Sequence, residues 1–338
     1  MEYLMLLWPH ANVRYQNESL KLAQGELRLM LDVFMPQAEV CAAKEGNLPA
    51  LRISTPGAMP QELLCAIRRH SLMYALFETR GDGLMRLTAS RAEAYIGADL
   101  PGILKYKGKT NELFLQLLIN AALYSGGFAH RGGEALTLLD PMCGRATTLF
   151  AAANYGWNTA GTDVDKNDLS EAEKFLKRYF EFHHMKYDFA RESKTIAGTS
   201  KAAPAMRFAF SDCVQRYKAG DTRTMQLVLT DAANARAVFG KEKFHMIVCD
   251  LPYGVQHTGV GGSVETLLQK ALPVWRESLK KGGTVALSFN AQTLKRDSVR
   301  AMLADAGFEV KSGGAYDEFS HWVEQAVTRD IAVARRTN

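Results

Sequence analysis

From about residue 136 onward, short apolar segments alternate with longer segments in which apolar residues recur at helical spacing. The short segments suit buried strands, because each one is bounded by small or polar turn residues. We predict strands at residues 136–139, 159–162, 226–230, 245–249 and 284–289, and helices at residues 146–155, 169–184 and 264–279. This alternation predicts an α/β fold with a doubly wound, mostly parallel sheet. Residues 308–311 and 330–335 are expected to pair as antiparallel edge strands.

The first 80 residues follow a different order. Segments typical of strands are residues 3–8, 38–43, 51–53 and 72–79, and segments typical of helices are residues 19–34 and 60–70. The resulting order, β-α-β-β-α-β, is that of a small α+β ferredoxin-like domain. The N-terminal quarter of the chain is therefore predicted to fold around a sheet of its own.

These patterns divide the chain into three stretches. We assign residues 1–94 to the ferredoxin-like domain, residues 95–130 to a linker with a connecting helix at 111–124, and residues 131–338 to the α/β domain. An insertion at residues 186–223 interrupts the α/β rhythm. Its basic residues are Lys186, Arg191, Lys194, Lys201, Arg207, Arg216, Lys218 and Arg223. The insertion is either a solvated surface excursion or an arm that contacts substrate, since loops on such scaffolds often carry binding.

Composition narrows the class of protein. The chain has 338 residues, of which 47% are apolar, and this is enough for a sizeable core. Its net charge of +5 is compatible with a polyanionic partner without demanding one. The five cysteines are scattered and never form a CxxC pair, which argues against disulfides and a zinc site. With no signal-peptide pattern and no run of 18 apolar residues, we expect a soluble, cytoplasmic monomer without a metal.

The first motif follows the strand at residues 136–139. It consists of Asp140, Pro141, Met142, Cys143 and Gly144. Ligands in open parallel sheets bind beyond the carboxyl ends of the strands, and a glycine there lets the backbone approach a ligand closely. Asp140 would repel a pyrophosphate and suits a cation better, such as the ammonium and sulfonium of S-adenosylmethionine. The alternative is an ordinary strand–turn–helix connection.

Two further acidic residues follow the next strands. Asp163, at the end of the strand at 159–162, can accept both ribose hydroxyls of a nucleoside, as acidic residues do in dinucleotide sites. Asp165 is expected to cap the helix that follows. Asp231, after the strand at 226–230, can accept a hydrogen bond from the adenine amino group. For Asp163 the alternative is a helix cap, and for Asp231 it is a turn residue.

The fourth motif, Asp250-Leu251-Pro252-Tyr253, ends the most apolar strand. Methylation of an exocyclic amine requires a nitrogen lone pair aimed at the methyl carbon, although conjugation with the ring ties that pair up. The Asp250 carboxylate and the Leu251 carbonyl can accept the amine hydrogens and favour a pyramidal, nucleophilic nitrogen. Pro252 stiffens the turn, and Tyr253 offers a surface for base stacking, worth about 1–3 kcal/mol. On its own the tetrapeptide could be a plain turn, but four such motifs in order predict a methyltransferase that positions two reactants.

The series DPMCGRATT, GTDVD, TDA and DLPYG resembles the RNA methylase family that contains the THUMP-type tRNA guanosine methyltransferases. The resemblance covers the chain from about Gly102 to its end and implies a Rossmann-like class I methyltransferase domain that uses S-adenosylmethionine. It implies that the cofactor loop is Asp140 to Ala146, the ribose acid is Asp163, the adenine-side acid is Asp231 and the catalytic tetrapeptide is residues 250–253. Asp250 would also contact the cofactor.

The chain departs from the family pattern in two places. Arg145 and Ala146 stand where the family usually has a small residue and a glycine, and Arg145 could meet either an acidic neighbour or a phosphate. Too few residues separate the ferredoxin-like domain from Gly102 for a full THUMP domain.

The resemblance implies methylation of an exocyclic amine, with guanosine in tRNA as the expected target and RNA as the partner. The alternatives are a DNA adenine or cytosine methyltransferase, a ribosomal RNA methyltransferase, and a non-catalytic RNA-binding or cofactor-sensing protein with the same fold.

Overall fold

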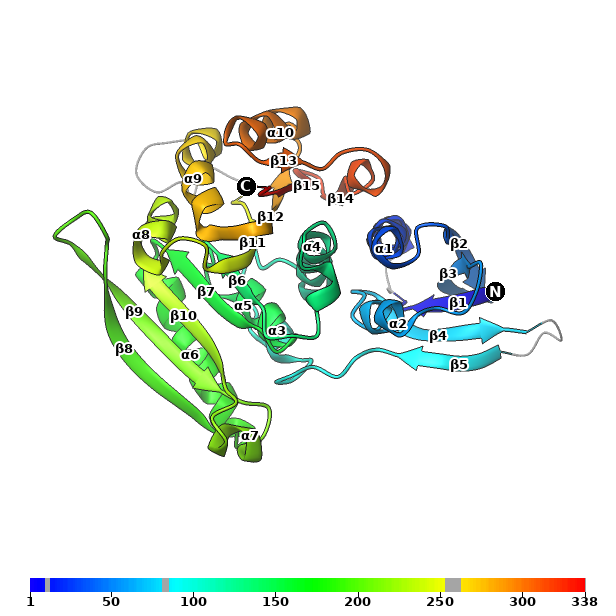
Figure 1. The fold of residues 1–338 in the computed structure, drawn as a ribbon, viewed down its shortest axis with the longest axis horizontal. Coiled ribbons are helices and arrows are strands. Elements are labelled where there is room, and N and C mark those ends of the chain that lie inside the picture. The colour runs from blue at the N-terminus through cyan, green and yellow to red at the C-terminus, as the bar shows by residue number, and fades with distance from the viewer. Residues whose placement is uncertain (10–12, 81–84, 253–262, 338) are drawn as a thin grey trace.

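The computed structural model describes residues 1–9, 13–80, 85–252 and 263–337. Figure 1 shows a smaller N-terminal part and a larger part, joined by a linker and by packing between helices. No helix among these described residues is both long enough and apolar enough to cross a lipid bilayer.

The smaller part is an antiparallel sheet with two helices. Its elements are β1 (Glu2–Leu7), α1 (Val13–Phe34), β2 (Glu39–Glu45), β3 (Leu48–Ser54), α2 (Gln61–Ile67), β4 (Met73–Thr79) and β5 (Met85–Ser90). The strand order is β2-β3-β1-β4-β5, and each neighbouring pair is antiparallel. The first four strands have the order and directions of the ferredoxin-like fold, which confirms that prediction.

Strand β5 is absent from the predicted elements. It pairs with β4, from Ala75 opposite Ser90 to Thr79 opposite Met85. None of its side chains is fully buried, so its sequence lacks the alternation of apolar and polar residues that marks a strand with one buried face.

The larger part contains the linker and the main sheet. Its helices are α3 (Leu100–Ile103), α4 (Glu112–Tyr124), η1 (Ala129–Arg131), α5 (Thr147–Ala153), α6 (Lys166–Phe182), α7 (Val214–Lys218), η2 (Ala232–Asn234), α8 (Ala235–Phe239), α9 (Val264–Ser278), α10 (Arg296–Asp305) and η3 (Gly314–Asp317). Its strands are β6 (Thr137–Asp140), β7 (Asn158–Asp163), β8 (Tyr187–Thr195), β9 (Ala202–Phe210), β10 (Arg223–Leu229), β11 (Phe244–Asp250), β12 (Leu279–Asn290), β13 (Glu309–Val310), β14 (His321–Glu324) and β15 (Val327–Arg335).

The main sheet has a parallel centre. Its order is β13-β15-β12-β11-β6-β7-β10-β9-β8, with β14 paired to β15. The five central strands, β12, β11, β6, β7 and β10, pair in parallel with one another. The strands added on either side of them pair antiparallel. The predicted doubly wound α/β sheet is confirmed. The expected antiparallel pairing of residues 308–311 with residues 330–335 is confirmed at this side of the sheet, where the two-residue β13 forms the edge and the buried β15 lies next to it.

Both faces of this sheet are covered. In β11, Met246 and Val248 join the apolar core that includes α4, α5 and α6, whereas Ile247 and Cys249 join the core that includes α9. Successive side chains of a strand point to opposite faces, so a strand buried on both faces must be apolar throughout. This explains why the segment before Asp250 is an unbroken apolar run.

The insertion at residues 186–223 forms regular structure. Strands β8 and β9 form a hairpin, and β9 pairs with β10, so the insertion extends the sheet (Figure 1). Half of its eight basic residues have carboxylate partners: Arg191 with Glu173, Arg207 with Asp188 and Glu192, Arg216 with Asp212 and Asp221, and Arg223 with Asp221. These charges are neutralised in place, which weakens the hypothesis of a basic arm that contacts substrate.

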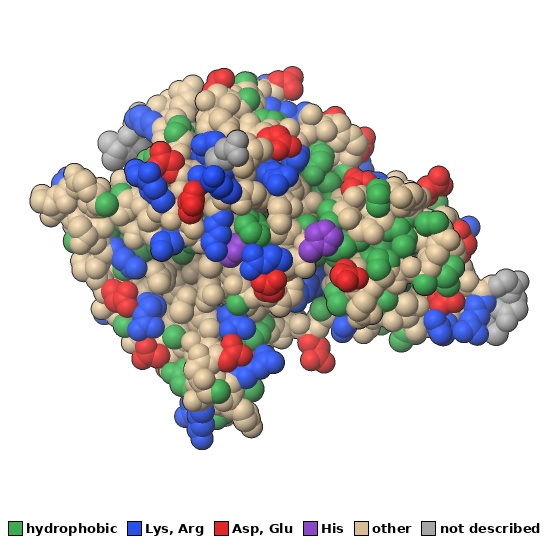
Figure 2. Space-filling view, in the orientation of Figure 1, with side chains coloured by type: hydrophobic (Ala, Val, Ile, Leu, Met, Phe, Trp, Pro, Cys, Tyr) green, Lys and Arg blue, Asp and Glu red, His purple; other side chains and the backbone are tan. Residues whose placement is uncertain are grey.

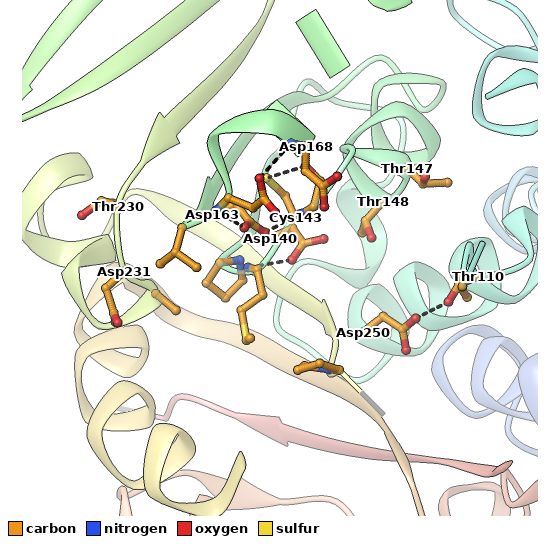
Figure 3. Close-up of a pocket in the computed structure, with 18 of the residues that line it drawn as sticks. Thr110, Asp140, Cys143, Thr147, Thr148, Asp163, Asp168, Thr230, Asp231 and Asp250 are labelled. Carbon is orange, nitrogen blue, oxygen red and sulfur yellow. Dashed lines mark hydrogen bonds between the residues drawn. The ribbon is translucent and has the colours of Figure 1, made fainter. Parts of the chain in front are cut away.

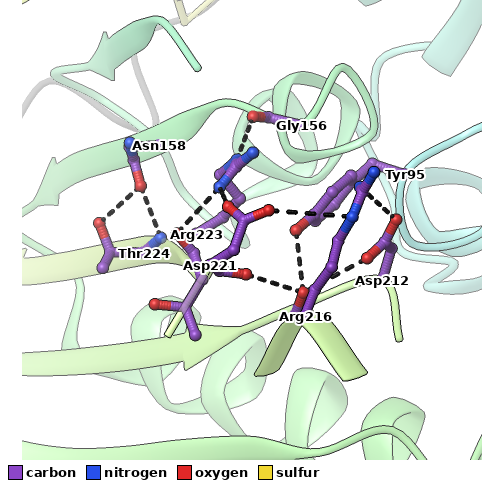
Figure 4. Close-up of polar contacts among 10 residues, drawn as sticks. Tyr95, Gly156, Asn158, Asp212, Arg216, Asp221, Arg223 and Thr224 are labelled. Carbon is purple, nitrogen blue, oxygen red and sulfur yellow. Dashed lines mark hydrogen bonds and ion pairs between the residues drawn. The ribbon is translucent and has the colours of Figure 1, made fainter. Parts of the chain in front are cut away.

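The amino-terminal end of β10 is tied to the linker (Figure 4). Arg223 donates from Nε to the carbonyl oxygen of Gly156 at 2.6 Å, and its guanidinium pairs with Asp221 at 2.6 Å. The same guanidinium lies 5.2 Å from the ring centre of Tyr95, a linker residue. Arg223 therefore has a structural role, since it fixes the linker against the sheet.

A buried polar network joins the two parts of the molecule. Glu26 of α1 is 1% exposed and accepts hydrogen bonds from the backbone and hydroxyl of Ser71 and, at 2.6 Å, from Nδ2 of Asn120 on α4. Buried carboxylates need such partners, because an unsatisfied one is strongly destabilising. The network fixes α1 of the N-terminal part against α4 of the larger part.

Candidate active site

The carboxyl ends of β6, β7, β10 and β11 meet at a pocket of about 550 Å³ (Figure 3). Parallel strands that end at one edge bring the residues after them together. The predicted site residues that line this pocket are Asp140, Pro141, Met142, Cys143, Gly144, Asp163, Asp231, Asp250 and Pro252. Leu251 is 1% exposed and donates its backbone N–H to the carbonyl of Ser288 at 2.9 Å. Tyr253 lies outside the described residues.

Asp140 lies at the base of the pocket. Its side chain is 2% exposed, and its Oδ1 accepts the backbone N–H of Met142 at 3.1 Å. Burial raises the pKa of Asp140 to about 7, although hydrogen bonds from Met142 and Thr148 partly offset this effect. The negative charges of Asp163 and Asp250 raise it further. A cation bound nearby would therefore favour the ionised form of Asp140.

Asp163 holds the loop after β6. One carboxylate oxygen accepts the backbone N–H of Gly144 at 2.7 Å, and the other accepts that of Asp165 at 2.8 Å. Burial raises the pKa of Asp163, and these two hydrogen bonds partly offset the effect. Asp165 caps α6 as predicted, because its side chain accepts from the backbones of Asn167 and Asp168.

The departure from the family pattern at Arg145 and Ala146 has a clear structural outcome at each residue. Arg145 meets an acidic neighbour, since its Nε donates to Asp168 at 2.8 Å. Its guanidinium also lies 4.8 Å from the ring centre of Tyr106, which lines the pocket. Ala146 is buried with φ +67°, a left-handed conformation that a glycine would adopt without strain. The loop thus makes the glycine-type turn with an alanine.

Asp231 lies where a ligand could contact it and also acts as a turn residue. It lines the pocket, and it also accepts the backbone N–H of Ala233 at 2.8 Å at the start of η2. In Figure 3 it lies to the left of Asp163, after the neighbouring strand β10.

Asp250 ends β11 and lies apart from the other aspartates, beside α4 (Figure 3). Its Oδ2 accepts a hydrogen bond from the hydroxyl of Thr110, which lies just before α4. Arg329 donates to the same hydroxyl at 3.2 Å and lies 4.0 Å from Oδ2. The ring centre of Phe114 lies 4.5 Å from the Arg329 guanidinium. Thr110 and Arg329 thus fix the orientation of the Asp250 carboxylate.

Residues 131–313 match the family of RMKL-like methyltransferase domains, UPF0020. The chain belongs to this family. The predicted RNA methylase membership is confirmed by this match, and the strand order confirms the Rossmann-like class I fold. A comparison with curated proteins finds no match.

Solved structures that resemble this family member include three methyltransferases. A TehB-like enzyme from Corynebacterium glutamicum is 14% identical over 60% of this chain and 81% of its own, with a TM-score of 0.36. Magnesium protoporphyrin IX methyltransferase from Synechocystis with bound S-adenosylmethionine is 14% identical over 70% of this chain and 88% of its own, with a TM-score of 0.41. Precorrin-6y C5,15-methyltransferase from Geobacter metallireducens is 12% identical over 72% of this chain and 98% of its own, with a TM-score of 0.42.

The charge of the pocket fits the cofactor of this family, S-adenosylmethionine. The charged residues that line it are one lysine, Lys166, and six aspartates, Asp140, Asp163, Asp165, Asp168, Asp231 and Asp250. Such a field attracts the sulfonium and ammonium groups of S-adenosylmethionine and repels the pyrophosphate of a dinucleotide. The acidic residues that line the pocket therefore fit a nucleoside ligand that carries positive charge.

Several residues that line or support the site were not predicted from the sequence. Thr110, Tyr106 and Thr147 line the pocket, and the hydroxyl groups of Tyr106 and Thr147 lie 3.0 Å apart. The one signal for Thr110 is its place before Asn111, which caps α4. The one sequence feature that marks Arg329 is its position next to Asp330, where two charged residues stand together near the start of an apolar strand.

Proposed function

We propose that this protein transfers a methyl group from S-adenosylmethionine to an exocyclic amine of a nucleic-acid base, with guanosine in tRNA as the expected target. The observation that carries the proposal is the placement of the Asp250 carboxylate on the wall of an acidic pocket at the sheet edge, held there by Thr110. A fixed carboxylate at this position can accept hydrogens from an amine. Family membership supports methyl transfer and RNA as the substrate class.

The aspartates after the central strands would hold the cofactor. Asp163 would accept the ribose hydroxyls, Asp231 would accept the adenine amino group, and Asp140 with the loop through Gly144 would face the cationic methionine portion. The bound cofactor supplies an electrophilic methyl group. The loop would support this arrangement, because the backbone N–H of Gly144 donates a hydrogen bond to Asp163 and ties the loop to this carboxylate.

The Asp250–Tyr253 turn would hold the target base. The Asp250 carboxylate and the Leu251 carbonyl oxygen would accept the two hydrogens of the amine and direct its lone pair at the methyl carbon. The proton lost on methylation would pass from the nitrogen to Asp250 or to water. Burial of the Leu251 side chain and its backbone bond to Ser288 fix the turn relative to β12, and accurate placement of reactants is the main source of rate here.

The proposal is tested by profiling nucleosides from tRNA, ribosomal RNA and DNA of a deletion strain, beside a strain complemented with the gene. We expect one N-methylated nucleoside, an N-methylguanosine in tRNA, to disappear from the deletion strain and return on complementation. Loss of a modification from ribosomal RNA or DNA alone would assign one of the alternative substrates. An unchanged profile, together with no transfer by the purified protein to RNA from the deletion strain, would contradict the proposal.

Cofactor affinity should rise with pH through the pKa of Asp140. Its folded pKa of about 7 lies above the ordinary value of 3.8, so fold stability falls as pH rises between these values. Because a bound cation favours the ionised carboxylate, affinity should increase about tenfold from pH 6 to pH 8. Calorimetry at the two pH values measures this change. In Asp140→Asn, cofactor affinity should change with pH only as far as the ligand itself titrates. An equal change in both proteins would contradict the attribution of the pH dependence to Asp140.

Replacement of Thr110 by valine should slow methyl transfer about 10- to 100-fold, since a hydrogen bond to a charged group contributes about 1.5–3 kcal/mol. The effect should fall on kcat and leave the cofactor affinity unchanged, because Thr110 acts by orienting Asp250. Thr110→Ser keeps the hydroxyl and should restore most of the rate. If serine and valine are equally slow, the hydroxyl has no positioning role.

A further inference from the structure

A second pocket, of about 310 Å³, lies where the N-terminal part meets the larger part. Its walls come from the end of α2, the segment after β5, and helices α4 and α5. Three arginines line it: Arg68, Arg69 and Arg91. No residue of the active site contributes to this lining.

All three guanidinium groups are fixed in place by neutral acceptors. Arg68 donates from Nε to the carbonyl oxygen of Ser90 at 3.1 Å, and Arg69 donates to that of Gly132. Arg91 donates to the carbonyl oxygen of Ser71 at 2.7 Å and to the side chain of Gln116. These bonds orient the groups without neutralising them. The remaining N–H groups stay available for a ligand, since each guanidinium has five donors.

The positive charges of these three arginines are not neutralised by ion pairs, unlike those of other arginines in the chain. Among the described residues, no carboxylate lies within ion-pairing distance of Arg68, Arg69 or Arg91. This contrasts with the arginines of the β8–β9 hairpin, which have acidic partners. Burial lowers the pKa of Arg91, and the nearby Tyr155 and Glu26 offset this effect only in part, since neither lies at ion-pairing distance from it.

Two carboxylates that also line the pocket limit the charge of its ligand. Glu112 lies 3.6 Å from Lys109, and Glu93 is exposed. Three arginines and two glutamates leave one positive charge in the lining. This balance suits a ligand group with a single negative charge, such as a phosphodiester, better than the multiple charges of a nucleoside triphosphate. Arginine forks match phosphate oxygens in geometry.

The second pocket lies beside the active site because both share the same two helices. On α4, Leu115 lines the active site and Gln116 lines the second pocket. On α5, Thr147 and Thr148 line the active site, and Ala151 lines the second pocket about one turn further on. Three residues of helix, from Thr148 to Ala151, correspond to roughly 5 Å along the helix axis. A single strand of RNA a few nucleotides long can span that distance.

We propose that this arginine pocket binds a backbone phosphodiester of the RNA substrate, a few nucleotides from the target base. The choice of RNA rests on the proposed function, whereas the affinity of the pocket for a phosphodiester rests on its own three arginines. The pocket would position the strand without reading its sequence, as phosphate contacts do. It would give the chain a substrate contact at the junction of its two parts.

The test measures binding of a short single-stranded RNA of mixed sequence to the full-length protein over a range of salt concentrations. We expect Arg68→Gln to weaken binding several-fold and to reduce the slope of log affinity against log salt by about 0.7, the value for one contact to a single strand. Arg68→Gln/Arg91→Gln should reduce it by about twice as much. Arg236→Gln, which removes an exposed arginine paired with Glu277 at 2.7 Å, is the control for net charge.

Two outcomes would overturn the inference. One is a slope for Arg68→Gln that equals the slope for Arg236→Gln. Another is displacement of the RNA by millimolar inorganic phosphate at constant ionic strength, because this would indicate a site for free phosphate. Arg68→Gln alone decides the matter if the double variant fails to fold. A protein that methylates no RNA but retains the arginine-dependent slope would contradict the proposed function, and only the affinity of the pocket for a phosphodiester would stand.

Discussion

Asp250→Asn should reduce methyl transfer by about 10²–10³-fold while the protein still folds and binds S-adenosylmethionine. The amide has the shape of the carboxylate but only one acceptor oxygen. Whichever way it turns, an NH2 group faces either the Thr110 hydroxyl or the target amine, where the wild type presents oxygen. Loss of one preorganised polar contact in an active site typically reduces kcat by this amount. Single-turnover assays with cofactor and RNA from the deletion strain measure the effect.

The matched control for this prediction is Asp188→Asn. Asp188 is an exposed carboxylate on β8 that lies 3.2 Å from Arg207, so the same chemical change there should leave transfer unaltered. Calorimetry should give the same cofactor affinity for wild type and Asp250→Asn to within a few-fold. A rate for Asp250→Asn close to that of Asp188→Asn would remove Asp250 from the reaction, and equal losses of rate and cofactor affinity would place its role in binding.

The sequence carries most of the information on the fold and on the strand-end motifs. The apolar run before Asp250 predicts a strand buried on both faces, and the parallel sheet then requires Asp140, Asp163 and Asp231 to meet at one edge. These four carboxylates could be identified because each one follows directly on an apolar strand. Their roles in cofactor binding and catalysis remain predictions.

The support of Asp250 could not be predicted in the same way. Thr110 and Arg329 contact one another although 219 positions separate them in the chain, and no local pattern predicts such a pair. The side-chain partner of Arg145 was similarly open, because Asp168 reaches it only when α6 packs beside the loop. The pattern of basic residues left the role of the insertion open, because their acidic partners emerge only in the fold: Arg191 pairs with Glu173 of α6, and Arg207, Arg216 and Arg223 pair with acidic residues of the insertion itself.

Asp163→Asn should weaken cofactor binding about 10²-fold, because hydrogen bonds from two ribose hydroxyls to a charged acceptor contribute about 1.5–3 kcal/mol each and the amide retains part of this. The fold should tolerate the change. One backbone hydrogen bond to the side chain is lost, but so is the unfavourable burial of a carboxylate beside Asp168 and Asp165. Calorimetry measures the affinity, and thermal denaturation without ligand measures the stability.

Asp165→Asn provides the strictest comparison for Asp163, because Asp165 lies two residues further along and lines the same pocket. Its carboxylate caps α6 by accepting from Asn167 at 2.7 Å. Asparagine caps helices about as well as aspartate, so this variant should keep both stability and cofactor affinity. Equal affinities for the two variants would mean that Asp163 only braces the Gly144 loop. A selective loss at Asp163 would assign the ribose to this carboxylate, since both substitutions remove one negative charge from the same cavity.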